Sequence, residues 1–165
     1  MLSLYDQCQS DVSQLSWMAR LGIETEVTMS FTIRGVDYFY VMVKDMPGEA
    51  YRLLTALAAV EVNLMAFNAI PMGPERTQLV LFPDSSERLI SAAKKMGLLL
   101  TGPERALLVQ GDDRLGALAD IHRKLFDAQI NVYASSGVTD GRGGYGYILY
   151  LRPEDFHNAE LVLGI

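Results

Sequence analysis

Apolar residues follow two different periods along this chain, and segments of each period alternate. Residues 38–43 combine aromatic and β-branched side chains, which is typical of a β-strand. An amphipathic helix is predicted next, because apolar residues recur there at i, i+3, i+4, i+7 and i+8 and the stripe ends near Val60. The residues of this stripe are Ala50, Leu53, Leu54, Leu57 and Ala58.

The remaining elements of the first half complete a known order. Residues 63–70 and 77–82 are predicted strands with a turn between them. A second helix then starts with a capping-box-like pair, Asp84 and Glu87, and ends before a glycine. With residues 98–100 as a short fourth strand, the order is β-α-β-β-α-β, the split β-α-β of ferredoxin-like folds.

The same pattern recurs at an offset of 68 residues without a gap. The predicted elements of the second copy are strands at residues 106–110, 131–136 and 144–151 and helices at residues 115–128 and 154–163. Ile165 corresponds to Gly97, so we expect the second copy to lack its last strand. Because internal duplication decides the architecture, the predicted fold class is α+β, with two ferredoxin-like βαββαβ repeats and antiparallel sheets.

The duplication divides the chain into three predicted parts. Residues 1–37 form an N-terminal extension with a short helix and a strand, residues 38–104 form the first repeat, and residues 105–165 form the second. The helix of the extension is predicted from the apolar stripe Val12, Leu15, Met18 and Ala19.

The missing strand would leave an unpaired sheet edge in the second repeat, and proteins cover such edges. One candidate is a hairpin in which residues 27–33 fold back on residues 36–43 through Arg34-Gly35. The other candidate is a partner chain.

Composition and charge narrow the functional classes. Half of the residues are hydrophobic and 21% are charged, which indicates a packed globular protein. A formal charge of −6 argues against nucleic-acid binding as the main purpose. Cys8 is the single cysteine, so we expect a reducing cytoplasm. The N-terminus lacks a basic segment, and no apolar run approaches the roughly 18 residues of a membrane span, so no membrane association is expected.

Each repeat carries the same loop after its first strand, with an aspartate followed by a glycine and later by an asparagine. These residues are Asp45, Gly48 and Asn63 in the first copy and Asp113, Gly116 and Asn131 in the second. The glycine stands at a helix start, where unbonded N–H groups and the helix dipole attract carboxylates. A purely structural explanation stays open, in which the aspartates cap the helices and the glycines permit a turn.

The first copy resembles the ACT domain, the small-molecule-binding regulatory module of amino-acid metabolism. The resemblance rests on Asp45-Met46-Pro47-Gly48 after a strand, an amphipathic helix, and Val62-Asn63-Leu64 opening the next strand, and it covers residues 38–165 as two tandem copies. It implies that paired domains hold an amino acid with the loop after the first strand and with the start of the second strand. It also implies a homodimer or higher homo-oligomer, with an enzyme of amino-acid metabolism as a candidate partner.

Carried onto this chain, the resemblance points to twelve ligand-binding residues. They are Asp45, Met46, Pro47, Gly48, Asn63 and Leu64 in the first copy and Asp112, Asp113, Leu115, Gly116, Asn131 and Val132 in the second. The second copy departs from the pattern, because Leu115 replaces the proline and Asp112 makes the loop more acidic. A bound zwitterion would place its carboxylate at the helix N–H groups and its ammonium near an aspartate or near carbonyls beside the asparagine.

Residues 144–150 suggest an alternative, because they resemble the third-strand aromatic motif of RNA-recognition domains, which share this order of elements. In that interpretation Tyr145 and Tyr147 lie on the open sheet face and stack on single-stranded RNA. Against it, Gly143 stands where a basic residue is expected. The pattern G-x-G-x-x-G at residues 141–146 joins two predicted strands, so we predict a hairpin turn and no dinucleotide site.

Support for catalysis is thin. His122 and His157 are the only histidines, and we expect His122 to be a structural residue on the inner side of a helix. No Cys and His cluster has metal-ligand spacing, so neither a metal nor a cofactor is expected. The sequence therefore predicts a non-catalytic regulatory protein that binds an amino acid or a similar metabolite. A regulatory subunit that acts through protein contacts without a ligand is the remaining alternative.

Overall fold

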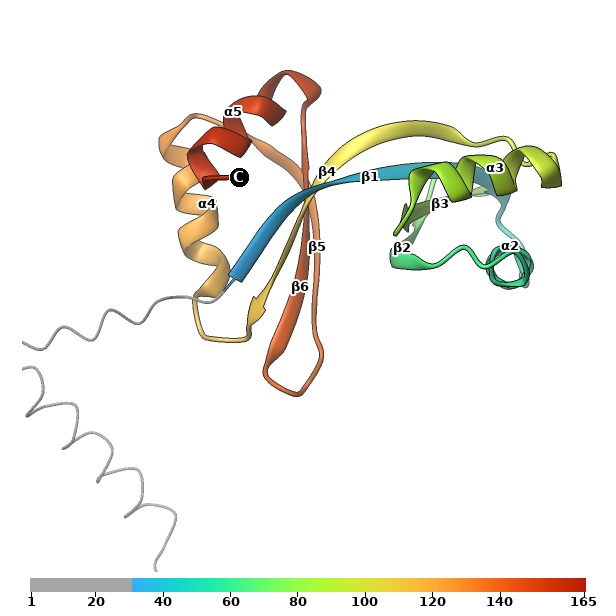
Figure 1. Ribbon diagram of the computed structural model, residues 1–165, viewed down its shortest axis with the longest axis horizontal. Coiled ribbons are helices and arrows are strands. Elements are labelled where there is room, and N and C mark those ends of the chain that lie inside the picture. Colours follow the sequence, from blue (N-terminus) through green and yellow to red (C-terminus); the bar gives the residue numbers. More distant parts are fainter. Residues whose placement is uncertain (1–30) are drawn as a thin grey trace, which may run out of the picture.

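Four helices and six strands make up residues 31–165, the part of the chain that the computed structural model describes (Figure 1). In chain order they are β1 (Phe31–Lys44), α2 (Glu49–Ala59), β2 (Leu64–Pro71), β3 (Arg76–Pro83), α3 (Ser86–Met96), β4 (Thr101–Asp112), α4 (Ala117–Asp127), β5 (Val132–Thr139), β6 (Gly144–Leu151) and α5 (Pro153–Leu163). The predicted α+β class and the repeated βαββαβ order are confirmed. The predicted helix at residues 12–19 lies outside the described residues.

All six strands form one antiparallel sheet, in the order β2-β3-β1-β4-β6-β5. The two central strands are shared between the repeats. The first half of β1 pairs with β4, from Phe31 opposite Gly111 to Tyr38 opposite Glu104, and so fills the place of the fourth strand of the second repeat. In return, the start of β4 lies against β1 at Tyr40 and supplies the fourth strand of the first repeat.

The residues upstream of Tyr38 therefore cover the unpaired edge, but the predicted hairpin at Arg34-Gly35 is wrong. Arg34 pairs with Leu108 and Gly35 with Leu107 inside one continuous strand. The inward and outward alternation runs unbroken through Gly35, so no turn is needed there. The sequence suggested domain boundaries between residues 37 and 38 and between residues 104 and 105. Strands β1 and β4 continue through these two positions. Residues 27–30 lie outside the described part.

Two local predictions need correction. Residues 98–100 form no strand, and β4 begins only at Thr101, although Leu98 and Leu100 pack against the core of the first repeat. Helix α3 is capped by Ser85, whose hydroxyl accepts the backbone N–H of Arg88, and not by Asp84. Gly97 ends that helix in the left-handed conformation (φ 65°), as predicted.

One face of the sheet carries the helices. Figure 1 shows α2 and α3 at one end of the molecule, beside the strands of the first repeat, and α4 and α5 at the other end, beside the strands of the second. Each pair encloses its own core against the sheet. The first core includes Phe39, Val41, Leu57, Leu81 and Leu89, and the second includes Leu107, Ile121, Leu125, Leu149 and Phe156.

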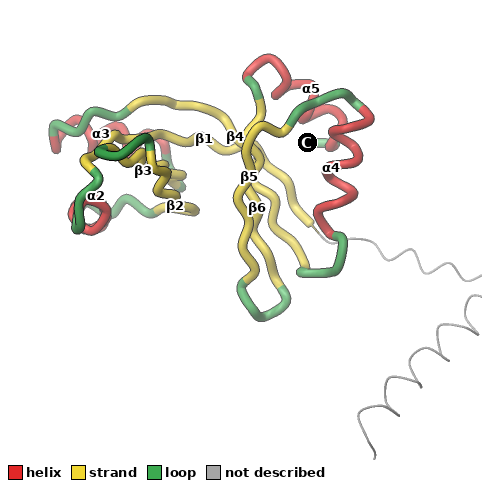
Figure 2. The backbone as a smooth tube through the Cα atoms, turned by 180° about the vertical axis from the view of Figure 1, so that it is seen from behind, coloured by secondary structure: helices red, strands yellow, loops and turns green. Residues whose placement is uncertain are grey.

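The opposite face forms a third core, which belongs to both repeats. Its buried residues are Val36, Val80, Phe82, Ala106, Leu108, Ile148 and Tyr150. The sheet is strongly twisted, so the strands of the two halves run in different directions (Figure 2). As a result, Asn68 on β2 donates a hydrogen bond to the Tyr150 hydroxyl on β6 at 3.0 Å. We name the seven buried residues of this third core the open-face core.

Phe82 tests whether the open-face core holds the two repeats together. Its side chain is 1% exposed, and its ring centroid lies 5.3 Å from that of Tyr38 and 6.1 Å from that of Tyr150. Phe82→Ala should lower the free energy of unfolding by about 3–5 kcal/mol in urea denaturation. The control Phe126→Ala, at a phenylalanine 71% exposed on α4, should change it by less than about 0.5 kcal/mol. Equal losses in the two variants would contradict a shared core.

Candidate functional site

The two acidic-glycine loops lie at opposite ends of the sheet, because they follow the antiparallel strands β1 and β4. Gly48 and Gly116 are the N-cap residues of α2 and α4, with φ 95° and 82°, and no side chain caps either helix. The explanation of Asp45 and Asp113 as N-caps is therefore wrong. The positive φ requires glycine, since other residues rarely adopt it.

The aspartates instead tie their loops to the neighbouring strand connection. The backbone N–H of Asp45 donates to the Glu75 carbonyl at 2.9 Å, and that of Asp113 donates to the Gly143 carbonyl at 2.7 Å. In the first repeat the Thr77 hydroxyl also donates to the Asp45 carboxylate at 3.2 Å. The position of Thr77 is occupied by Tyr145 in the second repeat, so the two loops have different surroundings.

A cavity of about 770 Å³ opens at the start of α4, and we name it the α4 pocket. It brings together three of the predicted residues, Asp113, Leu115 and Gly116. Arg114 of the same loop, the first turn of α4 and the strands β5 and β6 supply the rest of the lining, which includes Leu118, Ala119, Val138, Tyr145 and Tyr147. A Cβ atom added to Gly116 would meet nothing within 4 Å, so a ligand can approach the main chain there.

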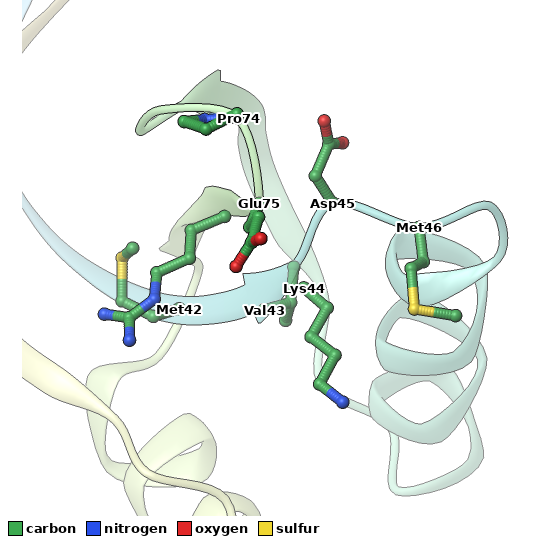
Figure 3. Close-up of a pocket in the computed structure, with 8 residues that line it drawn as sticks. Met42, Val43, Lys44, Asp45, Met46, Pro74 and Glu75 are labelled. Atoms are coloured by element: carbon green, nitrogen blue, oxygen red, sulfur yellow. The ribbon is translucent and has the colours of Figure 1, made fainter.

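The first repeat has a cavity of about 630 Å³ in a different place (Figure 3). It lies between the end of β1 and the β2–β3 connection, and its lining is Met42, Val43, Lys44, Asp45, Met46, Pro74, Glu75 and Arg76. Asp45 and Met46 belong to it, whereas Pro47 and Gly48 do not. The first-repeat cavity therefore does not include the start of its helix.

The predicted asparagines are not brought to the loops within one chain. Asn63 and Asn131 stand beyond the C-terminal ends of α2 and α4, each about 16 Å long for 11 residues. The following Leu64 and Val132 are partly buried against the two helix-covered cores. Asp112 is the exposed last residue of β4.

Two tyrosines of β6 also line the α4 pocket. The Tyr147 hydroxyl forms a hydrogen bond with Nε2 of His122 at 2.8 Å. The Tyr145 hydroxyl is buried and has no hydrogen-bond partner within residues 31–165. Burial raises the pKa of Tyr145, and the negative charge of Asp112 raises it further. The Tyr145 hydroxyl is therefore neutral, and it makes no hydrogen bond within the described residues.

The RNA-recognition alternative placed Tyr145 and Tyr147 on the open sheet face, and that placement is wrong. Tyr145 and Tyr147 do share a face of β6, but it is the face covered by α4 and α5, where both pack against the second core. Tyr147 is only 8% exposed. On the other face, Ile148 and Tyr150 lie in the open-face core and are also buried. Neither face of β6 presents an aromatic platform on which bases could stack.

The G-x-G-x-x-G pattern forms the predicted hairpin turn between β5 and β6. The Asp140 carboxylate accepts the backbone N–H groups of Arg142 and Gly144 at 2.7 and 2.9 Å. These hydrogen bonds lower the pKa of Asp140.

Within residues 31–165, no group of three or more His, Cys, Asp or Glu side chains is arranged to hold a metal ion. No helix in the same range has the length and apolar character needed to cross a membrane.

The two pocket tyrosines allow a matched test of the site. Tyr145→Phe removes a buried hydroxyl without a partner, so it should raise the free energy of unfolding by about 1 kcal/mol. Tyr147→Phe removes the hydrogen bond to His122 and should lower it by about 1 kcal/mol. Urea denaturation measures both. A loss of stability in Tyr145→Phe would show that its hydroxyl is already satisfied.

Comparisons with solved structures identify the fold. Protein BT0572 from Bacteroides thetaiotaomicron superposes with a TM-score of 0.69 at 14% identity, over 80% of this chain and 88% of that one. The regulatory subunits of aspartate kinase from Thermus thermophilus and Thermus flavus superpose with TM-scores of 0.56 and 0.53 at 14% and 12% identity, over 82% of this chain and 96% and 94% of theirs. No protein-family model and no curated protein sequence matches the chain. The structural likeness shows that this chain has the tandem ACT-like fold that its repeated motif resembles.

Proposed function

We propose that this chain is a non-catalytic regulatory protein that binds an amino acid or a similar small zwitterion in the α4 pocket. One observation carries the proposal. The α4 pocket joins a helix N-terminus without a side-chain cap, the carboxylate-bearing residue Asp113, and the side chain of Tyr145, whose buried hydroxyl has no partner in the described chain. Groups of both signs thus converge on a space large enough for a small metabolite.

The ligand chemistry follows from these groups. The N–H groups at the start of α4 and the positive end of its dipole favour a carboxylate. Asp113 provides a negative charge for an ammonium group. Leu115 and Leu118 offer apolar surface for a side chain. An α-amino acid combines a carboxylate, an ammonium group and a side chain in one molecule.

We assign the ligand to the second repeat and not to the first. In the first repeat the Asp45 carboxylate already accepts a hydrogen bond from Thr77, and Gly48 does not line the first-repeat cavity. Asn63 and Asn131 lie beyond the far ends of α2 and α4 from the loops. They would therefore reach a loop only from a neighbouring chain. The proposal therefore includes pairing with a second copy.

The structural neighbours support the regulatory class. Two of them are named regulatory subunits of aspartate kinase, and they share the fold over most of their length. We infer by this analogy that the chain regulates an enzyme of amino-acid metabolism. The single cysteine favours the cytoplasm as its compartment.

The outer surface of α2 favours pairing. Tyr51 is 73% exposed and Leu54 is 37% exposed, and Val60 follows at the end of the helix. Their counterparts on α4 include Ala119 and the hydrogen-bonded His122, so the two helices carry different side chains at these positions. We propose that this α2 face contacts a second copy of the chain. The same face supports the second candidate function, regulation through protein contacts without a metabolite.

The ligand proposal is tested by a thermal-shift screen over the twenty amino acids, followed by calorimetric titration of any hit. A ligand at 100 times its Kd should stabilise the protein by about 2.7 kcal/mol. Asp113→Asn should weaken binding about tenfold or more, because it removes the charge opposite the ammonium. Asp45→Asn, its counterpart in the first repeat, should leave binding unchanged. No stabilisation by any amino acid, or equal losses in the two variants, would exclude the proposed site.

Pairing is tested by sedimentation equilibrium of the full chain. The double variant Tyr51→Lys/Leu54→Lys should shift the protein toward the monomer, because two charges would be buried in the contact. Ala119→Lys on α4 is the matched control and should not change the mass. A monomeric wild-type protein at micromolar concentration would refute self-association.

A further inference from the structure

A third cavity lies on the opposite side of the sheet from the helices. It has a volume of about 520 Å³ and opens where β2 of the first repeat faces β4, β5 and β6 of the second. We name it the inter-repeat crevice. Met65 and Phe67 come from the β2 side, and Leu108, Gln110 and Ile148 come from the other. The crevice exists because the twisted sheet brings its two halves together over the open-face core.

One cation stands in this crevice without an anionic partner. The guanidinium of Arg34 contacts the Met65 sulfur at 3.1 Å, and within residues 31–165 it forms no ion pair with a carboxylate. Thioether sulfur is a weak acceptor, whereas a carboxylate can accept two guanidinium hydrogen bonds at once. By contrast, Arg105 on the helix-covered face bonds Glu160 at 2.8 Å. Arg34 is exposed, so its guanidinium is open to a ligand that enters the crevice.

The crevice also has free space beside its apolar walls. Gly146 lies on its floor, and a Cβ atom added there would meet nothing within 4 Å. The φ of Gly146 lies outside the left-handed region, so its backbone conformation does not require glycine. The absence of a side chain at this position therefore leaves the crevice open. Gln110 and Ser136 add neutral polar groups to a lining that is otherwise largely apolar.

We propose that the inter-repeat crevice binds a small organic anion, with a carboxylate on Arg34 and an apolar body against Met65, Leu108 and Ile148. The volume falls in the range of small-molecule sites, and an apolar lining with few polar groups is their usual composition. This site goes beyond the amino-acid site proposed above. Because side chains alternate across a strand, Tyr145 faces the α4 pocket while Ile148 faces the crevice.

The proposal has a structural consequence. A molecule in the crevice would touch β2 of one repeat and β4 and β6 of the other. It would therefore stabilise the packing of the two halves, which otherwise rests on the open-face core. Ligand binding of this kind stabilises only the state in which both walls are in place.

The test uses the full chain and two matched probes, 1-naphthylacetate and its neutral amide, 1-naphthylacetamide. Binding is followed by ¹⁵N–¹H NMR titration, with the amide signals of the lining residues as the readout. The carboxylate should bind at least tenfold more tightly than the amide and should shift the signals of Leu108, Gln110 and Ile148. Arg34→Met should reduce the affinity for the carboxylate to that for the amide. Gly146→Leu should fill the crevice and abolish binding of both probes.

Controls separate this proposal from the α4 pocket. Arg142→Met removes one positive charge from the exposed β5–β6 turn and should leave both affinities unchanged. Asp113→Asn, which tests the α4 pocket, should also leave them unchanged. Equal affinity for the two probes, undiminished binding in Arg34→Met, shifts confined to the start of α4, or no binding at millimolar concentration would each overturn the proposal. None of these results bears on amino-acid binding.

Discussion

The pairing of β1 with β4 is the interaction on which the rest of this structure depends. Each repeat lacks a complete set of strands, and an unpaired edge next to its first strand would expose a row of N–H and C=O groups. Strand β1 covers that edge in the second repeat, and the start of β4 covers it in the first. Two further features follow from the exchange. The acidic-glycine loops are directed to opposite ends of the sheet, and the open faces of the two halves form one core.

The two repeats share the same order of elements, but the side chains around their acidic-glycine loops differ. The glycines at the two helix starts adopt the same left-handed conformation. Gly116 lines the α4 pocket together with the first turn of its helix, whereas Gly48 does not line the first-repeat cavity. The difference lies in the third strand of each repeat. Thr77 is small and bonds the loop aspartate, whereas Tyr145 is large and its hydroxyl is left without a partner. Specific side chains, and not the fold, therefore distinguish the two loops.

The sequence was sufficient for the repeat and for all elements of residues 31–165 except the strand expected at residues 98–100, because periodicity and turn residues are local signals. Strand β6 has the predicted bounds, 144–151, and Gly97 ends its helix as expected. The errors arose where distant segments decide. Gly35 looked like a turn because the sequence does not show that Leu107 lies opposite it. The face of Tyr145 could not be assigned, since alternation shows which residues share a face but not which face the helices cover. The inter-repeat crevice depends on the twist of the whole sheet, and no single motif encodes it.

The β5–β6 hairpin separates the two proposed sites and is shared by both. Gly137, Val138 and Gly146 border the α4 pocket on one side and the inter-repeat crevice on the other. A Cβ atom on Gly137 would lie 2.7 Å from the Tyr147 ring, so these two strands are in contact here. Because the same residues line both sites, a shift of the hairpin in response to one ligand would change the shape of the other site. If both sites bind, their affinities are coupled, and thermodynamic linkage requires that each ligand changes the affinity of the other by the same factor.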